Sequence, residues 1–338
     1  MPDPALDPPL APDLRRRRLL LSAAATAAGV SASWPAASAD AWPAKPITLV
    51  SPYPAGGITD LLCRIVGEEL AKALGVAVVV ENRTGASGGI AHASVAKAPP
   101  DGYTLIMGGS APTAITPALN RSATYGPKDF EPIAYVAELP IVLSVHPSVP
   151  ARTAAEFMAY VKANSGKLSC GHHGNGSSNQ FACLTLARLS GTTIPDIPYR
   201  GAPQVNGDLL AGRVQIYFGT LPTQLPLAKE GKLKIVGATS PARLPTAPDI
   251  PTLDEQGLTG LDFTSWNALY APAGTPRPVI QRLAAEVAKI LANPEVKRRI
   301  EDTGCIVRPG TPESLGRLTM AEYDNYKRMG AETGIRME

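Results

Sequence analysis

The sequence predicts an α/β protein built of two lobes that meet at a hinged cleft. Two series of short apolar strands, each followed by an amphipathic helix, indicate two parallel sheets covered by helices. Apolar runs at residues 133–136, 141–145 and 266–271 resemble long strands that cross from one lobe to the other. The chain thus crosses between the lobes twice, once at residues 133–145 and once at residues 266–271. Two lobes joined in this way enclose a cleft, which is a typical place for a ligand.

The first lobe opens with a strand at residues 47–50 and an amphipathic helix at residues 61–74, which Gly75 should end. A continuous β-branched run follows at residues 76–80, and we expect it to be a strand buried on both faces. A helix is expected at residues 90–98 and a strand at residues 103–107.

The second lobe repeats this alternation. A capping box at Thr153 and Glu156 predicts a helix to about residue 163. The expected strands of this lobe lie at residues 168–170, 193–198, 214–218 and 234–239. Thr275 and Thr311 are expected to cap the last helices. The predicted division is a signal peptide at 1–39, lobe 1 at 40–140 plus 267–338, and lobe 2 at 141–266.

Composition narrows the classes of partner. The 338 residues carry a formal charge of only +3, and 18% are charged, with basic residues scattered along the chain. Neither a nucleic-acid footprint nor a patch for an acidic partner is visible. Aromatic residues make up 5%, which also disfavours stacking platforms for bases.

The amino-terminal residues have the pattern of an export signal. Four arginines at residues 15–18 precede a Leu-rich and then Ala/Ser-rich stretch that ends in Ala37-Ser38-Ala39. Cleavage is expected after Ala39, by the general secretory route or, given the paired arginines, the twin-arginine route. The alternative is a membrane anchor, but Gly29 and Pro35 interrupt the apolar stretch. We therefore expect a soluble protein that is exported.

Export changes how the four cysteines are interpreted, because thiols can pair in an oxidising compartment. Four cysteines allow three connectivities. Cys170 and Cys183 flank one short segment and are the favoured bridge. Cys63 and Cys305 lie in apolar stretches and are expected to be buried thiols.

Five loops lie where a strand hands over to a helix: residues 53–60, 87–89, 110–113, 174–178 and 200–202. In an open α/β sheet such loops gather at the carboxyl ends of the strands, where ligands bind. Helix N-termini present unpaired N–H groups and partial positive charge, and glycines allow close approach. With few cations among them, these loops suit a small carboxylate held by amides, hydroxyls and water. An ordinary strand–helix turn is the alternative for the first loop, where Asp60 is either a helix cap or a ligand contact.

Catalytic and metal sites are less well supported. Residues 85–89 match the G-x-S-x-G elbow around Ser87, but a hydrolase triad needs an acid and then a histidine later in the chain. The last histidine is His173, and His92 is only five residues beyond the serine. His172 and His173 are adjacent, so their side chains diverge, and no third ligand stands at a suitable spacing. No metal, cofactor or enzyme activity is predicted; an exported serine hydrolase using Ser87 is the alternative.

The motifs together resemble a known family. Residues 42–47 (WPAKPI) and 52–57 (PYPAGG), with Asp60 and Arg64, resemble the opening of the Bug/TctC solute receptors of tripartite tricarboxylate transporters. The likeness continues, in family order, at residues 79–83, 100–105, 199–203, 251–253 and 271–276. It implies an exported, periplasmic receptor with the periplasmic-binding-protein-like (type II) fold. We also expect a monomer. Such a receptor closes on a small organic acid and delivers it to membrane permease subunits. A ligand-sensing module for a signalling partner is a further alternative.

The resemblance, with the loops above, defines the candidate ligand-binding residues. They are Tyr53, Gly56, Gly57, Ile58, Thr59, Asp60, Ser87, Ser110, Thr113, Gly176, Ser177, Ser178, Gly201, Ala202 and Gly219. Gly219 departs from the family, which often has an acidic residue there, and favours a ligand that lacks an amino group or is bulkier. The loop with His172, His173 and the cysteine pair is also unusual for the family.

Overall fold

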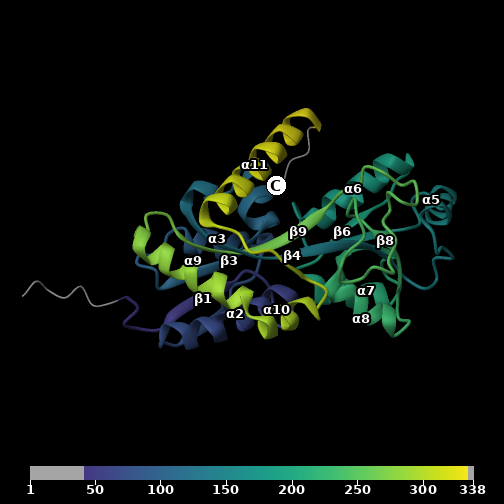
Figure 1. The fold of residues 1–338 in the computed structure, drawn as a ribbon. Coiled ribbons are helices and arrows are strands. Elements are labelled where there is room, and N and C mark those ends of the chain that lie inside the picture. Colours follow the sequence, from purple (N-terminus) through teal and green to yellow (C-terminus); the bar gives the residue numbers. More distant parts are fainter. Residues whose placement is uncertain (1–41, 334–338) are drawn as a thin grey trace, which may run out of the picture. The chain divides into compact units, whose positions relative to one another are not determined.

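One mixed sheet organises the residues that the structure, a computed structural model, describes, which are 42–333 (Figure 1). Ten strands take part in this region, and the main path runs β2-β1-β3-β9-β4-β7-β5-β6, with β8 and β10 also paired to β4. Residues 43–333 belong to one compact unit. The predicted signal peptide lies outside the described residues.

The first half of the sheet is parallel, as predicted. Its strands and helices are β1 (Ile47–Ser51), α2 (Ile58–Leu74), β2 (Val78–Asn82), α3 (Gly89–Val95) and β3 (Thr104–Gly109). Gly75 ends α2 in the left-handed conformation, with φ 72°, as predicted. The expectation that the second strand is buried on both faces was wrong. Because β2 is the edge strand, every second residue faces outward, and Val79 is 54% exposed.

Two long strands connect the halves. We expected separate strands around residues 133–145, but β4 (Phe130–Val145) is continuous. Its first part pairs antiparallel with β9 (Thr264–Pro272) up to Pro140, and from Ile141 it pairs with β7 and β8 instead. Proline has no N–H to donate to a neighbouring strand. Pro140 is therefore well tolerated where it lies, at the point where β4 changes partners.

The second half contains the four predicted strands, of which β6 and β8 are shorter than predicted and β5 and β7 begin two residues later. Its elements are α5 (Ala154–Ala163), β5 (Cys170–His172), α6 (Ser178–Ser190), β6 (Asp196–Pro198), α7 (Ala202–Leu210), β7 (Ile216–Thr220), α8 (Leu221–Lys229) and β8 (Lys234–Ala238). The capping box of α5 is confirmed, since Thr153 accepts from the Glu156 amide and Glu156 bonds back. A disulfide joins Cys170 of β5 to Cys183 of α6. Cys63 and Cys305 are buried free thiols.

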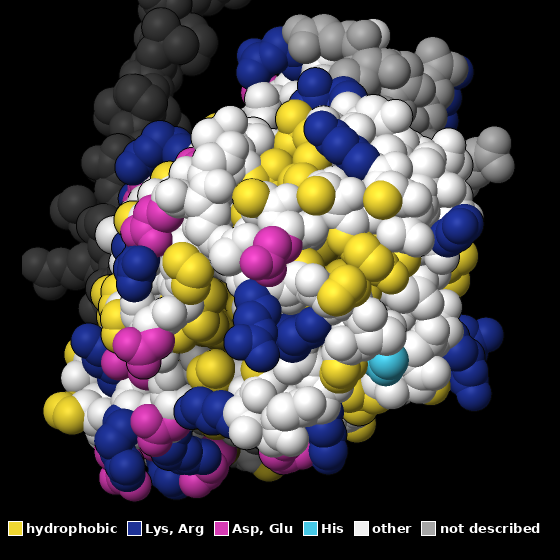
Figure 2. Space-filling model, turned by 90° about the vertical axis from the view of Figure 1, so that its right-hand side faces the viewer, with side chains coloured by type: hydrophobic (Ala, Val, Ile, Leu, Met, Phe, Trp, Pro, Cys, Tyr) yellow, Lys and Arg dark blue, Asp and Glu magenta, His cyan; other side chains and the backbone are white. Residues whose placement is uncertain are grey.

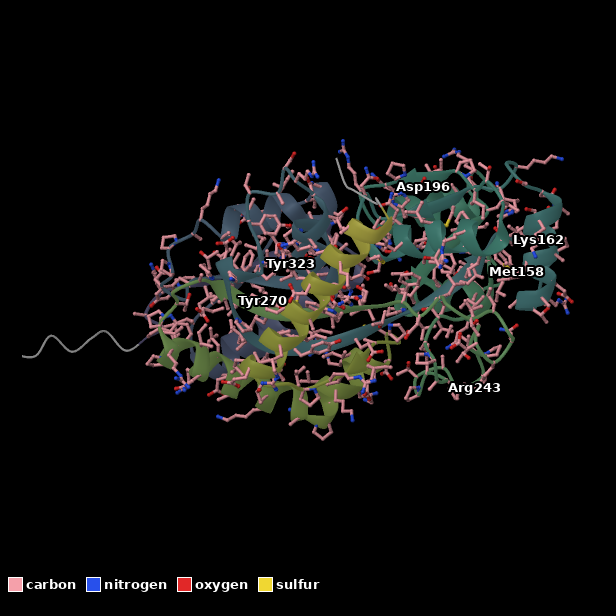
Figure 3. The ribbon with its side chains drawn as sticks, turned by 90° about the horizontal axis from the view of Figure 1, so that it is seen from above. Met158, Lys162, Asp196, Arg243, Tyr270 and Tyr323 are labelled. Atoms are coloured by element: carbon pink, nitrogen blue, oxygen red, sulfur yellow. A yellow bond between two sulfur atoms is a disulfide. The ribbon has the colours of Figure 1, made fainter. Side chains whose placement is uncertain are left out.

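The carboxy-terminal segment returns to the first half. It comprises α9 (Arg277–Ala292), α10 (Pro294–Glu301), β10 (Ile306–Val307) and α11 (Pro312–Thr333). Thr275 does not cap α9, because its hydroxyl donates to the Pro272 carbonyl and the N-cap residue is Pro276. Helix α11 lies over the first half (Figure 3). There Thr319 shares a 2.6 Å hydrogen bond with Tyr270 of β9.

Four short helices complete the first half between the strands. They are η1 (Ala86–Gly88), the π-helical η2 with α4 (Ser110–Ile115 and Thr116–Leu119), and η3 (Pro127–Asp129). Each half has its own core: Trp266 and Tyr270 are central to one, and Phe157 and Phe218 to the other. A third cluster joins the halves, because Phe181 of α6 packs against Tyr326 of α11 with ring centroids 5.4 Å apart.

The surface of the second half carries both signs of charge. On the face shown in Figure 2, Lys and Arg side chains are interspersed with Asp and Glu and with apolar patches. Within residues 42–333 the structure contains no helix with the length and apolar character needed to cross a membrane.

Candidate ligand-binding site

A cavity of about 60 Å³ lies between the two halves of the sheet. That volume is enough for several water molecules or a small solute. Two surfaces enclose it. We call the residues from the first half the first wall; Tyr53, Thr59 and Ser110 belong to it, with Asn267 of β9. We call the residues from the second half the second wall; Ser177, Ser178 and Gly201 belong to it.

Four helices begin at this cavity. The residues that precede their first turns all line it: Gly57 before α2, Ser177 before α6, Gly201 before α7 and Thr220 before α8. At Gly57, Gly201 and Thr220 no side chain caps the first turn, so the backbone N–H groups there have no side-chain acceptor. Four helix N-termini place partial positive charge around one small space.

Formal charge is absent from the lining. None of the described residues that line the cavity is Asp, Glu, Lys or Arg. One imidazole contributes, that of His173, which hydrogen bonds with the Tyr217 hydroxyl. Loss of hydration on burial lowers the pKa of His173 to about 4, so this ring is neutral at physiological pH. An anion here would be held by dipoles and hydrogen bonds.

The hydroxyl groups of the first wall are already committed as donors. Tyr53 donates to the Ser87 carbonyl (3.3 Å) and Thr59 to the Asn267 side-chain oxygen (3.1 Å). Ser110 donates to a carboxylate oxygen of Glu322 (2.8 Å). A hydroxyl has one hydrogen and two lone pairs. These three groups can therefore offer a ligand only acceptor lone pairs.

The hydroxyl groups of the second wall have free hydrogens. The Ser178 hydroxyl is buried, with the residue 3% exposed, and has no hydrogen-bond partner among the described residues. Ser177 accepts from the Gln180 amide (3.2 Å), which leaves its own hydrogen available. An unsatisfied buried donor costs free energy until an acceptor arrives. The second wall is thus arranged for a negatively charged acceptor.

Comparison with known proteins identifies the family. The model of the tripartite tricarboxylate transporter family receptors, TctC, matches residues 62–334. The chain belongs to this family.

Solved TctC-type structures share the fold closely. The periplasmic binding protein BugD superposes with a TM-score of 0.82 at 32% identity, covering 88% of this chain and all of BugD. MatC from Rhodopseudomonas palustris, solved with malate, gives 0.80 at 34% identity over 85% of this chain and 99% of its own. A second R. palustris protein, solved with adipate, gives 0.83 at 32% identity over 87% of this chain and 99% of its own. The predicted two-lobed α/β receptor fold and the resemblance to the Bug/TctC receptors are confirmed.

This TctC chain brings most of the candidate residues together. Those that line the cavity are Tyr53, Gly57, Ile58, Thr59, Ser110, Ser177, Ser178, Gly201 and Ala202. Those that the structure places outside the lining are Gly56, Asp60, Ser87, Thr113, Gly176 and Gly219.

Asp60 has an internal role in the first loop. Its carboxylate accepts from the Gly56 amide, from Asn82 and from Arg64, the last in two bonds of 3.0 Å. Burial opposes ionisation, but the hydrogen bonds from Arg64, Asn82 and Gly56 outweigh it and lower the pKa of Asp60. Asp60 therefore braces the loop that carries Gly57, and its carboxylate engages the Gly56 amide.

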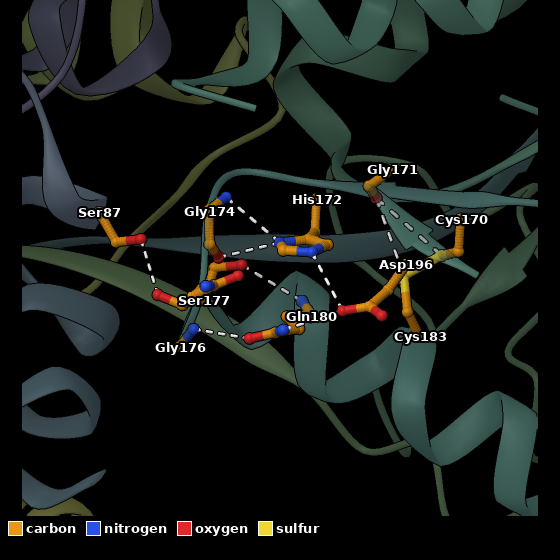
Figure 4. Close-up of polar contacts among 11 residues, drawn as sticks. Ser87, Cys170, Gly171, His172, Gly174, Gly176, Ser177, Gln180, Cys183 and Asp196 are labelled. Carbon is orange, nitrogen blue, oxygen red and sulfur yellow. Dashed lines mark hydrogen bonds and ion pairs between the residues drawn. A yellow bond between two sulfur atoms is a disulfide. The ribbon is translucent and has the colours of Figure 1, made fainter. Parts of the chain in front are cut away.

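Ser87 connects the two halves instead of lining the cavity. Its hydroxyl donates to the Asn175 carbonyl across the interface (2.8 Å, Figure 4). The fit is close, since a Cβ on Gly174 would lie 2.6 Å from the Ser87 hydroxyl oxygen. Both ring nitrogens of His92 bond elsewhere, to the Gly88 carbonyl and the Thr113 hydroxyl. The geometry therefore does not pair Ser87 with His92 as a nucleophile and its base.

The other three candidates are engaged locally. Thr113 also accepts from the Gly109 amide (3.1 Å) at the start of η2. The Gly176 amide donates to the Gln180 side chain (2.7 Å), which fixes the turn before α6. Gly219 faces the buried Gln224, whose side chain would be 2.5 Å from a Cβ at that position. Gln224 therefore fills the space that a larger residue at 219 would need.

Several lining residues were not among the candidates. His173, Asn179, Trp266 and Asn267 line the cavity, and Leu139 does so from β4. Trp266 and Asn267 lie within a long apolar strand, and such a run indicates core rather than ligand contact. Two of these lining residues gave a signal in the sequence: Asn267 is a polar residue in the run at 266–271, and His173 precedes the candidate loop at 174–178.

Proposed function

We propose that this protein is a periplasmic receptor that captures a small carboxylate by closure of two lobes and delivers it, unchanged, to a tripartite tricarboxylate-type permease. The observation that carries the proposal is the convergence of four helix N-termini on a cavity lined without charged side chains. Helix N-termini bind carboxylates through backbone N–H groups and the helix dipole. The malate and adipate bound to the two R. palustris relatives support the same ligand class.

Closure would use the strands that connect the halves. We place lobe 1 at residues 40–140 plus 267–338 and lobe 2 at 141–266, with Pro140 at the hinge. A ligand that contacts both walls binds the closed form better than the open form and so shifts the population toward it. The Ser87–Asn175 hydrogen bond would form only when the lobes meet.

Export and delivery complete the proposal. A signal peptide cleaved near Ala39 would place residues 40–338 in the periplasm, where the Cys170–Cys183 disulfide is stable. We expect a monomer, because the cavity is complete within one chain.

Calorimetry on the mature chain, residues 40–338, tests the proposal. Mono-, di- and tricarboxylates should be compared with their uncharged amides. At least one carboxylate should bind and raise the melting temperature by mass action, its amide should bind much more weakly, and the ligand should be recovered unchanged. Failure of every carboxylate, or equal binding of the amides, would overturn the proposal.

A further inference from the structure

Glu322 is a partly buried carboxylate behind the first wall of the cavity. It lies on α11, does not itself line the cavity, and accepts a 2.8 Å hydrogen bond from Ser110. Ser110 lines the cavity and is 1% exposed. The contact joins residues that are 212 positions apart in the chain, so it exists only because α11 folds back over the first half.

No basic side chain among residues 42–333 compensates this carboxylate. Burial raises the pKa of Glu322, and only the neighbouring Trp266 indole and the Ser110 hydroxyl act in the opposite direction. The Trp266 indole N–H is close enough to act on the carboxylate, yet makes no hydrogen bond of good geometry within residues 42–333. The other titratable groups that interact with Glu322 are the phenols of Tyr135, Tyr270 and Tyr326. The net effect is a pKa above the ordinary value for glutamate.

The protonation state of Glu322 decides what Ser110 can do. When Glu322 is ionised it can only accept, so the Ser110 hydrogen is committed to it and the Ser110 oxygen faces a ligand as an acceptor. When Glu322 is protonated it can donate to Ser110, which frees the serine hydrogen for a ligand acceptor. Protonation of Glu322 therefore changes the Ser110 hydroxyl from an acceptor to a donor toward the ligand.

The other hydroxyl groups of the first wall present acceptor lone pairs to a ligand, as Ser110 does when Glu322 is ionised. Thr59 and Tyr53 donate to protein acceptors and also present lone pairs. A ligand carboxylate is best placed against the second wall, where Ser178 has a free hydrogen at the start of α6. The opposite end of the ligand then meets acceptors, and a hydroxyl group is the small neutral group that can donate to them.

We propose that Glu322 is a specificity-determining positioning residue that acts through Ser110, so that the cavity selects carboxylates bearing a hydroxyl group over the same acids without it. The inference rests on the proposed function, since it concerns the second end of the same ligand.

The test uses pairs of acids that differ by one hydroxyl group: lactate and propionate, malate and succinate, and citrate and tricarballylate. Affinities are measured by calorimetry on the mature chain at about pH 8, where carboxylates with an ordinary pKa are ionised. The hydroxy acid of the best-binding pair should bind about tenfold tighter or more than the acid without the hydroxyl group, because that acid leaves a buried acceptor of the first wall unpaired. The preference should shrink as the pH is lowered and Glu322 takes up a proton.

Variants separate this role from a structural one. Glu322→Gln removes the charge and can donate to Ser110, so the preference should fall at least several-fold and lose its pH dependence. Glu322→Met, which leaves Ser110 without a partner, should act in the same direction. In a Ser110→Ala background Glu322→Gln should leave the ratio unchanged. Asp324→Asn, an exposed carboxylate on the same helix, is the matched control and should behave as wild type.

The outcomes distinguish the two proposals. If no acid of any pair binds, the proposed function fails and this inference fails with it. If acids bind but the hydroxyl preference is absent, or is unchanged in both Glu322 variants, only the inference is overturned. A thermal melt of each variant verifies that folding is retained, and a reduced ratio with a wild-type melting curve supports the inference.

Discussion

The two walls of the cavity have opposite hydrogen-bonding character although both are built from strand-to-helix loops. In the first wall, Tyr53, Thr59 and Ser110 donate to protein acceptors. In the second wall, Ser178 has no protein partner among the described residues and Ser177 only accepts from the protein, so both hydroxyl hydrogens are available to a ligand. A ligand with one anionic end and one donating end would fit in a single orientation. The type of loop therefore does not determine which ligand groups are recognised. The protein group that hydrogen bonds with each hydroxyl decides whether that hydroxyl can donate to a ligand.

The largest expected effect comes from placing a carboxylate on the second wall. Ser178→Asp puts a negative charge at the first residue of α6, where the helix dipole stabilises it and the fold should be retained. The charge repels a carboxylate ligand, so affinity should fall about 100-fold or more by calorimetry. Retained affinity in a variant with a normal melting temperature would show that the anion lies elsewhere.

Removing the free donor of the second wall should have a smaller effect. Ser178→Ala deletes one hydrogen bond to a charged group, a loss of about 1.5–3 kcal/mol, or roughly 10- to 150-fold in affinity. Because this hydroxyl has no protein partner, the melting temperature should not decrease. A large loss of stability with unchanged affinity would reverse the assignment of this wall.

The contact between the halves should tune closure. Ser87→Ala removes the 2.8 Å hydrogen bond to Asn175, worth about 0.5–1.5 kcal/mol, so affinity should fall roughly 2- to 12-fold. The dissociation rate, measured by stopped-flow fluorescence, should rise by a similar factor. If the rate of association alone changes, Ser87 does not act as a closed-state contact.

The matched substitution on the first wall should affect stability more than carboxylate affinity. Thr59→Val leaves the Asn267 oxygen, which is buried, without its donor and should destabilise the fold by about 1–3 kcal/mol in a urea titration. Affinity for a simple carboxylate should change less than about threefold, since this wall contacts the other end. A loss of carboxylate affinity as large as that of Ser178→Ala would erase the difference between the walls.

The smallest effect concerns acid stability behind the second wall. The His172 imidazole, whose Nε2 lies 3.3 Å from a carboxylate oxygen of Asp196, is the main cause that lowers the pKa of Asp196 to about 2 (Figure 4). Because its pKa is depressed on folding, Asp196 contributes stability above its unfolded pKa of about 4 that is lost as the pH falls toward 2. Asp196 is partly exposed, so solvent screening should limit the effect to less than about 1 kcal/mol. Asp196→Asn should flatten the stability curve in that pH window only.

The strand-to-helix alternation predicted where the site would form, because loops at the carboxyl ends of parallel strands must converge. It could not predict the direction of each hydrogen bond. Glu322 and Ser110 are far apart in the chain, and Asn267 belongs to a strand whose pattern indicates core. The sequence predicts separate strands at residues 133–136 and 141–145, whereas pairing with β9 on one side and β7 on the other keeps β4 continuous. These features depend on contacts between residues that are far apart in the chain, which the local sequence pattern does not reveal.

The most direct test is a crystal structure of the mature chain with the tightest-binding carboxylate. The account predicts that the carboxylate oxygens accept hydrogen bonds from the Ser178 hydroxyl and from backbone N–H groups at the start of α6, at about 2.7–3.1 Å. The other end of the ligand should face Thr59 and Ser110. A carboxylate bound against the first wall, or held by a Lys or Arg side chain, would contradict the account.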